Sequence, residues 1–534
     1  MSAAPSSHKK SSNLQTYINL MKAFVGSGLL GMPFAFKNSG IWLGSVAMLI
    51  LSVITLHCIL ILVASQTEIA KRKMTQHLEE EQEKHATLHD NDSDSDDVSS
   101  FKPSQKSGGS AERTKSSSKN RSHHLLNDDR ANSDYESTAG TYSSSENDIS
   151  DAYQHQSPST PLPYSATSTN AVEQPYTAGQ LGDMTEFSLN VPPGDTLEQS
   201  AELEKFAPNT FGEVGEYALT RIGRIIIELL LVFTQTGFCI AYLIFISNNL
   251  HHHVPALQSW MCVGITGLLL IPFALIRNIK YLTPFSIISE FTLIVGLTLV
   301  IYFDVITLQP SRILWVAKQF PLSTFPTFLG VAIYSFEGVG LVLPIHNNMK
   351  KRSSFRVVVI IAFISYLILM MLFGLLGYLA FGEDVKDIIT DDLDDHPVPR
   401  IVIDICLIIA LFFTYPIQLF PVPELADSYL RSVSVLNNFV VHFAVRIAMV
   451  IFTVGGAILG GDYFGIILSY IGAVGGSSLA YTLPGLIHLV LFWKKNNWFW
   501  RLKDLTLALF GLGCLALTLV VNTYHIVTTG EGAG

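Results

Sequence analysis

Two stretches of this sequence determine the fold that we expect, LMKAFVGSGLLGMPFAF at residues 20–36 and FLGVAIYSFEGVGLVLP at residues 328–344. Each is apolar and long enough to enter a lipid bilayer as a helix, yet each contains residues that weaken a helix near its middle. These residues are Gly26, Gly28, Gly31 and Pro33 in the first stretch, and Gly330, Gly338, Gly340 and Pro344 in the second. A helix interrupted inside a membrane leaves main-chain N–H and C=O groups that protein, water or a ligand must satisfy.

The chain around these stretches has a composition typical of a membrane protein. It has 534 residues, of which 49% are hydrophobic and 15% are charged, and its formal net charge is −10. Soluble domains are about 25% charged, so the composition argues against a soluble enzyme, a disordered protein and a basic nucleic-acid binder. The five cysteines lie inside apolar runs without a disulfide or metal-type spacing, so we expect neither a metal nor a cofactor.

Apolar runs of membrane-spanning length follow one another along the chain. They lie near residues 16–36, 41–65, 222–247, 256–276, 283–306, 325–345, 357–381, 401–423, 440–460, 463–492 and 505–528. We therefore predict an all-α membrane protein with 11 transmembrane helices. Residues 1–70 would hold an N-terminal tail and helices 1–2, and residues 209–534 would hold helices 3–11.

The basic residues predict the orientation of the chain. Lys and Arg near the predicted membrane ends gather on the side of the N-terminus, which the positive-inside rule places in the cytosol. The C-terminus and the acidic stretch EDVKDIITDDLDD at residues 383–395 would then lie on the opposite, lumenal or extracellular side. Lys22, His442 and Arg446 fall inside predicted spans, and we expect them to extend toward the membrane interface.

Residues 71–208 form a polar insertion rich in Ser and Asp on the cytosolic side. We predict that it is disordered, because so few apolar residues cannot offset the entropy lost on ordering. Runs such as SDSDD and YSSSEND resemble targets of acid-directed kinases, so cytosolic kinases or signalling partners are candidate ligands of this segment. An inert polar spacer is the alternative.

The paired interruptions suggest how the membrane part works. If ten spans form two groups of five, the weakened spans 1 and 6 occupy equivalent places, as in transporters built from inverted repeats. Main-chain N–H groups at such a break suit a carboxylate, and C=O groups or an acidic side chain suit an ammonium group. One site with both features suits an amino acid. Close helix packing through small residues is the alternative for either glycine cluster alone.

Several polar side chains inside predicted spans are candidate functional groups. Glu337 lies in the middle of span 6, where it would carry a proton, attract the substrate ammonium, or act as a neutral structural acid. Glu228, Glu290 and Asp404 would join networks between helices or be solvated near the membrane interface. The polar residues of Thr234–Thr236 and the segment containing Thr414, Tyr415 and Gln418 could line a cavity.

Four segments also resemble the amino acid/auxin permease family: LMKAFVGSGLLGMPFAFKNSG, FTQTGFCIAYLIF, YSFEGVGLVLPIHNNMK and FFTYPIQLFPVPEL. Within that family they are similar to the proton-assisted amino acid transporters of animals and to the vacuolar amino acid exporters of fungi and plants. The resemblance implies a core of two inverted five-helix repeats of the LeuT/APC type plus one extra helix. Asn19 and His346 depart from the pattern of many animal members, which have His and Glu there.

The resemblance also implies a site. It places substrate contacts at Gly26, Ser27 and Gly28, and the span-6 break at Phe336, Glu337 and Gly338, with Thr414 and Tyr415 facing the same cavity. Glu337 is the candidate for proton coupling.

The expected function is therefore transport of small neutral amino acids with protons, not catalysis. Two alternatives stay open: an amino-acid sensor that signals through the insertion, and a sodium-coupled transporter. We expect a multi-pass protein of the vacuolar or endolysosomal membrane, with the plasma membrane second, and no nucleic-acid partner.

Overall fold

The computed structural model describes residues 10–93, 197–277, 279–310, 313, 316, 320–336, 338–393, 397–431, 438–461 and 463–529. Contacts divide the chain into a unit of residues 1–80 and 187–534, which holds a bundle of helices, and a unit of residues 81–186. The structure describes only the end of one helix in the second unit. The described parts of the chain contain helices and turns but no β-strand.

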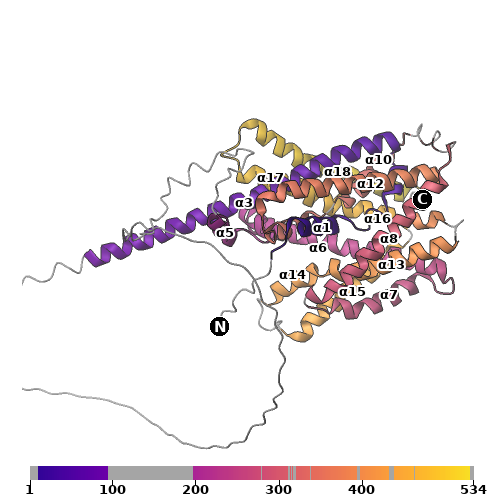
Figure 1. Ribbon diagram of the computed structural model, residues 1–534, viewed down its shortest axis with the longest axis horizontal. Coiled ribbons are helices and arrows are strands. Elements are labelled where there is room, and N and C mark those ends of the chain that lie inside the picture. Colours follow the sequence, from indigo (N-terminus) through magenta and orange to yellow (C-terminus); the bar gives the residue numbers. More distant parts are fainter. Residues whose placement is uncertain are drawn as a thin grey trace, which may run out of the picture. The chain divides into compact units, whose positions relative to one another are not determined.

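Nine helical stretches among the described residues are long and apolar enough to cross a membrane. Most are formed by one main helix: α3 (Ile41–Ser93), α6 (Phe211–His253), α8 (Thr283–Thr307), α12 (Phe355–Phe381), α13 (Pro397–Leu419), α15 (Phe439–Gly460) and α18 (Trp498–Thr529) (Figure 1). The backbone of α6 is kinked at Leu219 and Thr220, and the stretch that begins in α13 continues to Leu430. Two more consist of consecutive shorter helices: α10 (Phe325–Ser335) with α11 (Val339–Asn347), and α16 (Phe464–Ile471) with α17 (Leu483–Leu491). The chain is therefore an all-helical protein of membrane type.

Shorter helices complete the bundle. The first apolar run forms α1 (Asn13–Phe24) and α2 (Met32–Lys37), and α7 (Ser259–Ala274) is apolar but shorter than the nine stretches. The remaining helices lie in connections: α5 (Leu197–Phe206), α14 (Pro421–Leu430), η2 (Ile279–Leu282), η3 (Arg352–Ser354), η4 (Gly382–Asp384) and η5 (Ile389–Leu393). The count of 11 spans and the inverted repeat stay predictions.

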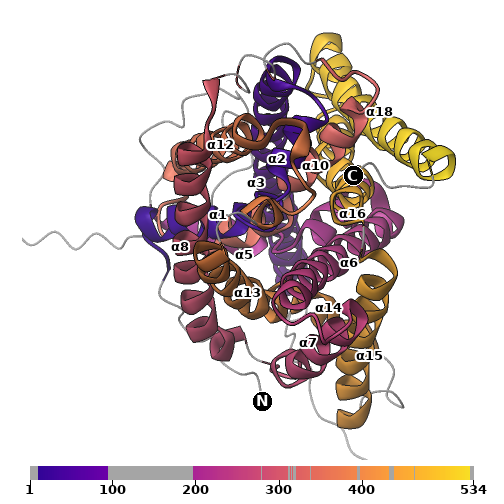
Figure 2. The ribbon, with the colours of Figure 1, turned by 90° about the vertical axis from the view of Figure 1, so that its right-hand side faces the viewer.

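The helices pack so that α10 lies in the interior of the bundle. α8 runs along α13, α6 contacts α7, α13 and α15, and α12 contacts α1 and α2 (Figure 2). α10 packs against α16 and α18, and its residues from Pro326 to Ser335 are all buried. The sequence of α10 is apolar on all sides of the helix, so burial on all sides is expected.

The outer surface of the bundle is apolar. Val53 on α3, Leu268 on α7, Phe291 on α8 and Leu459 on α15 are among many exposed large hydrophobic side chains. A surface of this kind is unusual in a soluble monomer and is expected where a helix faces lipid.

Small residues allow α10 to approach α16 and the segment after it. Between α16 and α17 the chain forms two π-helical turns, η6 (Gly472–Gly476) and η7 (Ser478–Thr482). A Cβ atom on Gly472 would lie 2.0 Å from the carbonyl oxygen of Gly330 and 2.6 Å from the amide nitrogen of Tyr334. The backbones are thus in direct contact, as small residues permit between membrane helices.

The prediction that His442 and Arg446 extend to the membrane interface is wrong. Both side chains are buried on α15 and bind the same carboxylate, that of Asp427 on α14. His442 Nδ1 lies 2.6 Å from Asp427 Oδ1, and Arg446 donates to Asp427 Oδ2 at 3.1 Å. A carboxylate at this distance compensates the two bases inside the protein, so they do not have to reach solvent.

The structure also differs from the expectation of disorder at both ends of the insertion. α3 continues to Ser93, far beyond its apolar part, because residues after Ser65 are mostly strong helix formers. Arg72 donates to Glu68 at 2.9 Å, one turn away, which supports this extension. At the other end, residues 197–206 form α5. Residues 94–196 lie outside the described residues, so disorder stays a prediction there.

Glu204 of α5 bonds to two other segments of the bundle. Its carboxylate pairs with Lys10, just before α1, and with Arg352 of η3 at 3.3 Å. Ser11 forms a single parallel bridge with Met349, in which Ser11 N donates to Asn348 O at 2.8 Å and Lys350 N donates to Ser11 O at 2.9 Å. The start of α1, the end of α11 and α5 are therefore held together at one end of the bundle.

The glycine contact between α10 and η6 gives a stability prediction. Gly472→Ala would force the backbones apart, and we expect the free energy of unfolding to fall by about 1–3 kcal/mol. The measurement is the melting temperature of the purified protein in detergent. Gly455→Ala on α15 is the matched control, because an added Cβ there meets no atom within 4 Å. Equal melting temperatures for the two variants would contradict the contact.

Candidate functional site

The first apolar run is interrupted between Phe24 and Met32, as the sequence predicts. The linking residues form turns, in which Leu29 N donates to Gly26 O at 3.2 Å and Leu30 N donates to Ser27 O at 3.0 Å. The amides of Gly26, Ser27 and Gly28 donate to no acceptor in the described part of the chain. Three successive N–H groups without an acceptor in a largely buried turn are available to bind an anion.

The second interruption lies between Ser335, which ends α10, and Val339, which begins α11. Glu337 falls inside it and lies outside the described residues, so the structure does not test its predicted role. The carbonyl of Ser335 accepts a hydrogen bond from the hydroxyl of Tyr366 on α12. One carbonyl at this break is therefore occupied by the protein itself.

Glycines bring the two interruptions into contact. A Cβ atom on Gly28 would lie 2.6 Å from Ser335 Oγ, and one on Gly338 would lie 2.7 Å from Phe24 Cδ1. The hydroxyls of Ser27 and Tyr334 are hydrogen-bonded at 2.5 Å across the same interface. Both breaks therefore meet inside the bundle, and larger residues at 28 or 338 would separate them.

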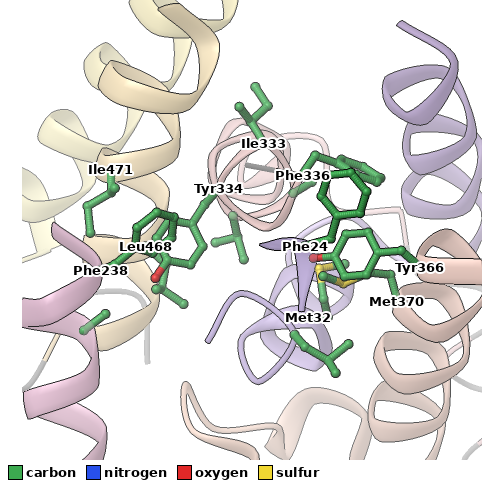
Figure 3. Packing of buried hydrophobic residues seen from close by; sticks show 14 of the residues in the cluster. Phe24, Met32, Phe238, Ile333, Tyr334, Phe336, Tyr366, Met370, Leu468 and Ile471 are labelled. Carbon is green, nitrogen blue, oxygen red and sulfur yellow. The ribbon is translucent and has the colours of Figure 1, made fainter. Parts of the chain in front are cut away.

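Aromatic side chains close the space around the breaks. Tyr334 points toward Phe238 of α6, with ring centroids 4.7 Å apart, whereas Phe336 points toward Phe24 and Tyr366 (Figure 3). The two residues at the end of α10 thus pack toward different neighbours. The site is enclosed by apolar rings, which lower the local dielectric and strengthen polar interactions inside it.

A small cavity of about 50 Å³ lies beside the two breaks. Residues of α1, the first break, α6, α10, α11 and α13 line it, among them Lys22, Gly26, Gly28, Gln235, Phe238, Tyr242, Tyr334, Ser335, Gly338, Thr414 and Gln418. A water molecule needs roughly 10–15 Å³ of such space, so the cavity holds a few waters or a small polar ligand.

Four of the predicted site residues line this cavity: Gly26, Gly28, Gly338 and Thr414. Three other predicted site residues do not line the cavity. Ser27 bonds to Tyr334, Phe336 stacks on Phe363 with centroids 5.4 Å apart, and the hydroxyl of Tyr415 pairs with Thr453 on α15 at 2.6 Å. The cavity is therefore formed mainly by glycine backbone on the α1 side and by side chains on the α6 and α13 sides.

Lys22 is a site residue that the sequence interpretation missed. Its ammonium lies 3.6 Å from Glu290 Oε1 and donates to Ser286 Oγ at 3.4 Å on α8, and its extension toward the membrane interface stays a prediction. Next to this pair, the hydroxyls of Ser289 and Thr414 lie 2.5 Å apart. Lys22 and Glu290 thus form an ion pair between α1 and α8 at the edge of the cavity.

A second, larger cavity of about 1010 Å³ lies at the end of the bundle that carries η4 and η5. Lys37, His251, Asp387, Arg400 and Tyr463 are among its lining residues. Beside it, His253 Nε2 lies 2.7 Å from Asp404 Oδ2, and Arg400 donates to Asp391 Oδ1 at 2.6 Å. No group of three metal-ligating side chains is present among the described residues.

Two carboxyl groups at this end of the bundle have raised pKa values. Burial raises the pKa of Asp387 to about 6, although the amide of Gly465 donates to its carboxylate at 3.0 Å. Burial raises the pKa of Asp392 to about 8, against the opposing effect of the Lys386 amide. Desolvation disfavours the charged form of each, so both groups bind a proton more tightly in the folded protein than in the unfolded chain.

These pKa values predict how stability depends on pH. Because the folded state binds these protons more tightly, its stability falls as pH rises through about 6 for Asp387 and about 8 for Asp392. We expect the melting temperature in detergent to decrease between pH 5 and pH 8. Asp392→Asn should reduce this decrease and raise the melting temperature at pH 8.

Asp384→Asn is the control for this experiment, because Asp384 belongs to the same acidic segment but its side chain is exposed. An Asp392→Asn variant whose melting temperature follows pH as steeply as that of the wild type would contradict the assignment.

The chain matches a known family over most of its helical part. Residues 9–79 and 198–525, more than half of the chain, match the family model described as transmembrane amino acid transporter protein. The match omits most of the insertion and covers both helix breaks.

Individual relatives agree with this match. Amino acid transporter AVT3B of Arabidopsis thaliana is 30% identical over 320 residues, covering 57% of this chain and 75% of that protein. AVT3C of the same plant is 32% identical over 332 residues, covering 57% and 72%. Vacuolar amino acid transporter 4 of Saccharomyces cerevisiae is 28% identical over 353 residues, covering 58% and 49%.

Proposed function

Since the chain belongs to the transmembrane amino acid transporter family, we propose that it moves small neutral amino acids across a membrane together with protons. It is a transporter and not an enzyme. The observation that carries the proposal is the cavity between the two helix breaks, where Gly26 and Gly28 present unpaired main-chain amides.

The chemistry of the cavity supports a small zwitterion. The substrate carboxylate would accept hydrogen bonds from the amides of Gly26, Ser27 and Gly28, which lack other partners. The ammonium group would face the break between α10 and α11, where Glu337 supplies a carboxylate in the sequence. A volume of about 50 Å³ favours substrates with a small side chain.

Proton coupling would use Glu337, which lies at a break inside the membrane, where an unpaired charged carboxylate is unfavourable. Protonation removes this penalty and allows the site to change its exposure. Alternating access would follow from rocking of two inverted five-helix repeats, with the two broken helices at equivalent places and an eleventh helix outside them.

The proposed location is the membrane of a vacuole or an endolysosome, with the plasma membrane second. It rests on relatives whose names describe vacuolar transporters in two yeasts. The N-terminus would lie in the cytosol and the C-terminus in the lumen, as the distribution of basic residues indicates. An acidic lumen would then supply the protons that accompany amino acids to the cytosol.

Uptake into proteoliposomes tests the proposal. Purified protein should move alanine, glycine or proline into vesicles faster when a pH gradient is imposed than when it is collapsed, because protons moving down their gradient drive the coupled step. Replacing sodium by choline should leave the rate unchanged. Uptake that ignores the pH gradient, or that requires sodium, would sink the proton-coupled mechanism.

Glu337→Gln tests the coupling residue. We expect gradient-driven uptake to fall at least about tenfold, because glutamine cannot gain or lose a proton at this pH. Glu424→Gln on α14 is the matched control, since that side chain is exposed and forms no ion pair with the residues that the structure describes. Full gradient-driven uptake by the Glu337→Gln variant would assign Glu337 a structural role.

A further inference from the structure

Gln235 lies on the face of α6 that borders the central cavity. Phe238 and Tyr242 follow it at positions three and seven residues along the helix, and all three line the cavity. This spacing places residues on one face of an α-helix. The cavity wall formed by α6 is therefore one amide followed by two aromatic rings.

The side-chain amide oxygen of Gln235 is buried without a hydrogen-bond partner among the described residues. The residue is 8% exposed, and its Oε1 atom has no partner in the described part of the chain. Buried side-chain polar atoms are nearly always satisfied by protein or ordered water, so a missing partner requires an explanation. A ligand that occupies the cavity would supply one.

The neighbouring residues show that a polar side chain on this part of α6 can find a hydrogen-bond partner. Thr234 donates to Leu230 O at 2.7 Å, and Thr236 donates to Val232 O at 2.7 Å, so both hydroxyls bond within α6. Of these three consecutive polar residues, Gln235 is the one that lines the cavity. Its side chain thus faces the space that the proposed substrate would occupy.

We propose that Gln235 binds the transported amino acid, with its amide oxygen accepting a hydrogen bond from the substrate ammonium. The proposal rests on the function proposed above and adds a contact from α6 to those from the two breaks. The unpaired amides of Gly26 and Gly28 bind the carboxylate at another wall of the same cavity. Phe238 and Tyr334 pack against each other beside it and limit the room for the substrate side chain.

This arrangement predicts a specific kinetic effect. Gln235→Leu keeps a branched side chain that fills most of the same space but removes the acceptor, so it should raise the KM for alanine about 10- to 100-fold. The maximal rate should change little, because the contact stabilises bound substrate throughout the cycle. Gln235→Glu keeps an acceptor and should retain a KM within about tenfold of the wild type.

The experiment measures alanine uptake by proteoliposomes containing the full-length wild type or each variant. Thr236→Val is the matched control, because Thr236 is adjacent, equally buried and bonded only to its own helix. Its KM should equal that of the wild type. Melting temperatures in detergent, compared with and without alanine, exclude misfolding: Gln235→Leu should melt near the wild-type temperature but lose stabilisation by alanine.

The outcomes separate this inference from the proposed function. If the wild type does not take up alanine, glycine or proline, the proposed function fails. If the wild type transports but Gln235→Leu keeps its KM, the amide serves a bound water or the fold, and the inference fails alone. If Gln235→Glu loses as much affinity as Gln235→Leu, an acceptor at this position does not support binding, which also overturns the inference.

Discussion

The direct contact between two main-chain breaks is the constraint on which the rest of this structure depends. Gly28 lies against Ser335, and Gly338 lies against Phe24, at distances that leave no room for a Cβ atom. Because the breaks touch, Gly26 and Gly28 of the first break line a cavity that the second break helps to enclose. The dense packing of α10 against α16, also through glycine, keeps this contact in the interior of the bundle.

The sequence predicts the helices well because each span is encoded locally. Length and apolarity specify the spans, and glycine with proline specifies the breaks. Interactions between distant segments are not encoded in this way. The sequence alone indicates interfacial positions for His442 and Arg446. The structure shows that both bind Asp427, which lies on a different helix. The sequence also does not predict the extension of α3, because a polar composition indicates disorder even when the residues are good helix formers.

In the candidate site, too, locally encoded features are predicted and contacts between distant segments are not. The sequence predicts the glycines at residues 26, 28 and 338, because a cavity at a helix break needs main chain without side chains. Residues that depend on the rotation of a helix were harder to assign. Tyr415 follows Thr414 directly, yet its hydroxyl turns to Thr453 while Thr414 lines the cavity. Gln235 had a detectable signal, its spacing of three and seven residues to Phe238 and Tyr242, but only packing shows which face points inward.

The carboxylate of Glu204 has a consequence for how the end of the polar insertion and the helix bundle influence each other. It joins α5, where the insertion ends, to Lys10 ahead of α1 and to Arg352 after α11. If α1 moves away from the end of α11, α5 must follow or lose one of these pairs. By thermodynamic reciprocity, a molecule that binds α5 and disturbs Glu204 then changes the preference of α1 for one position, and the position of α1 changes the affinity for that molecule by the same factor.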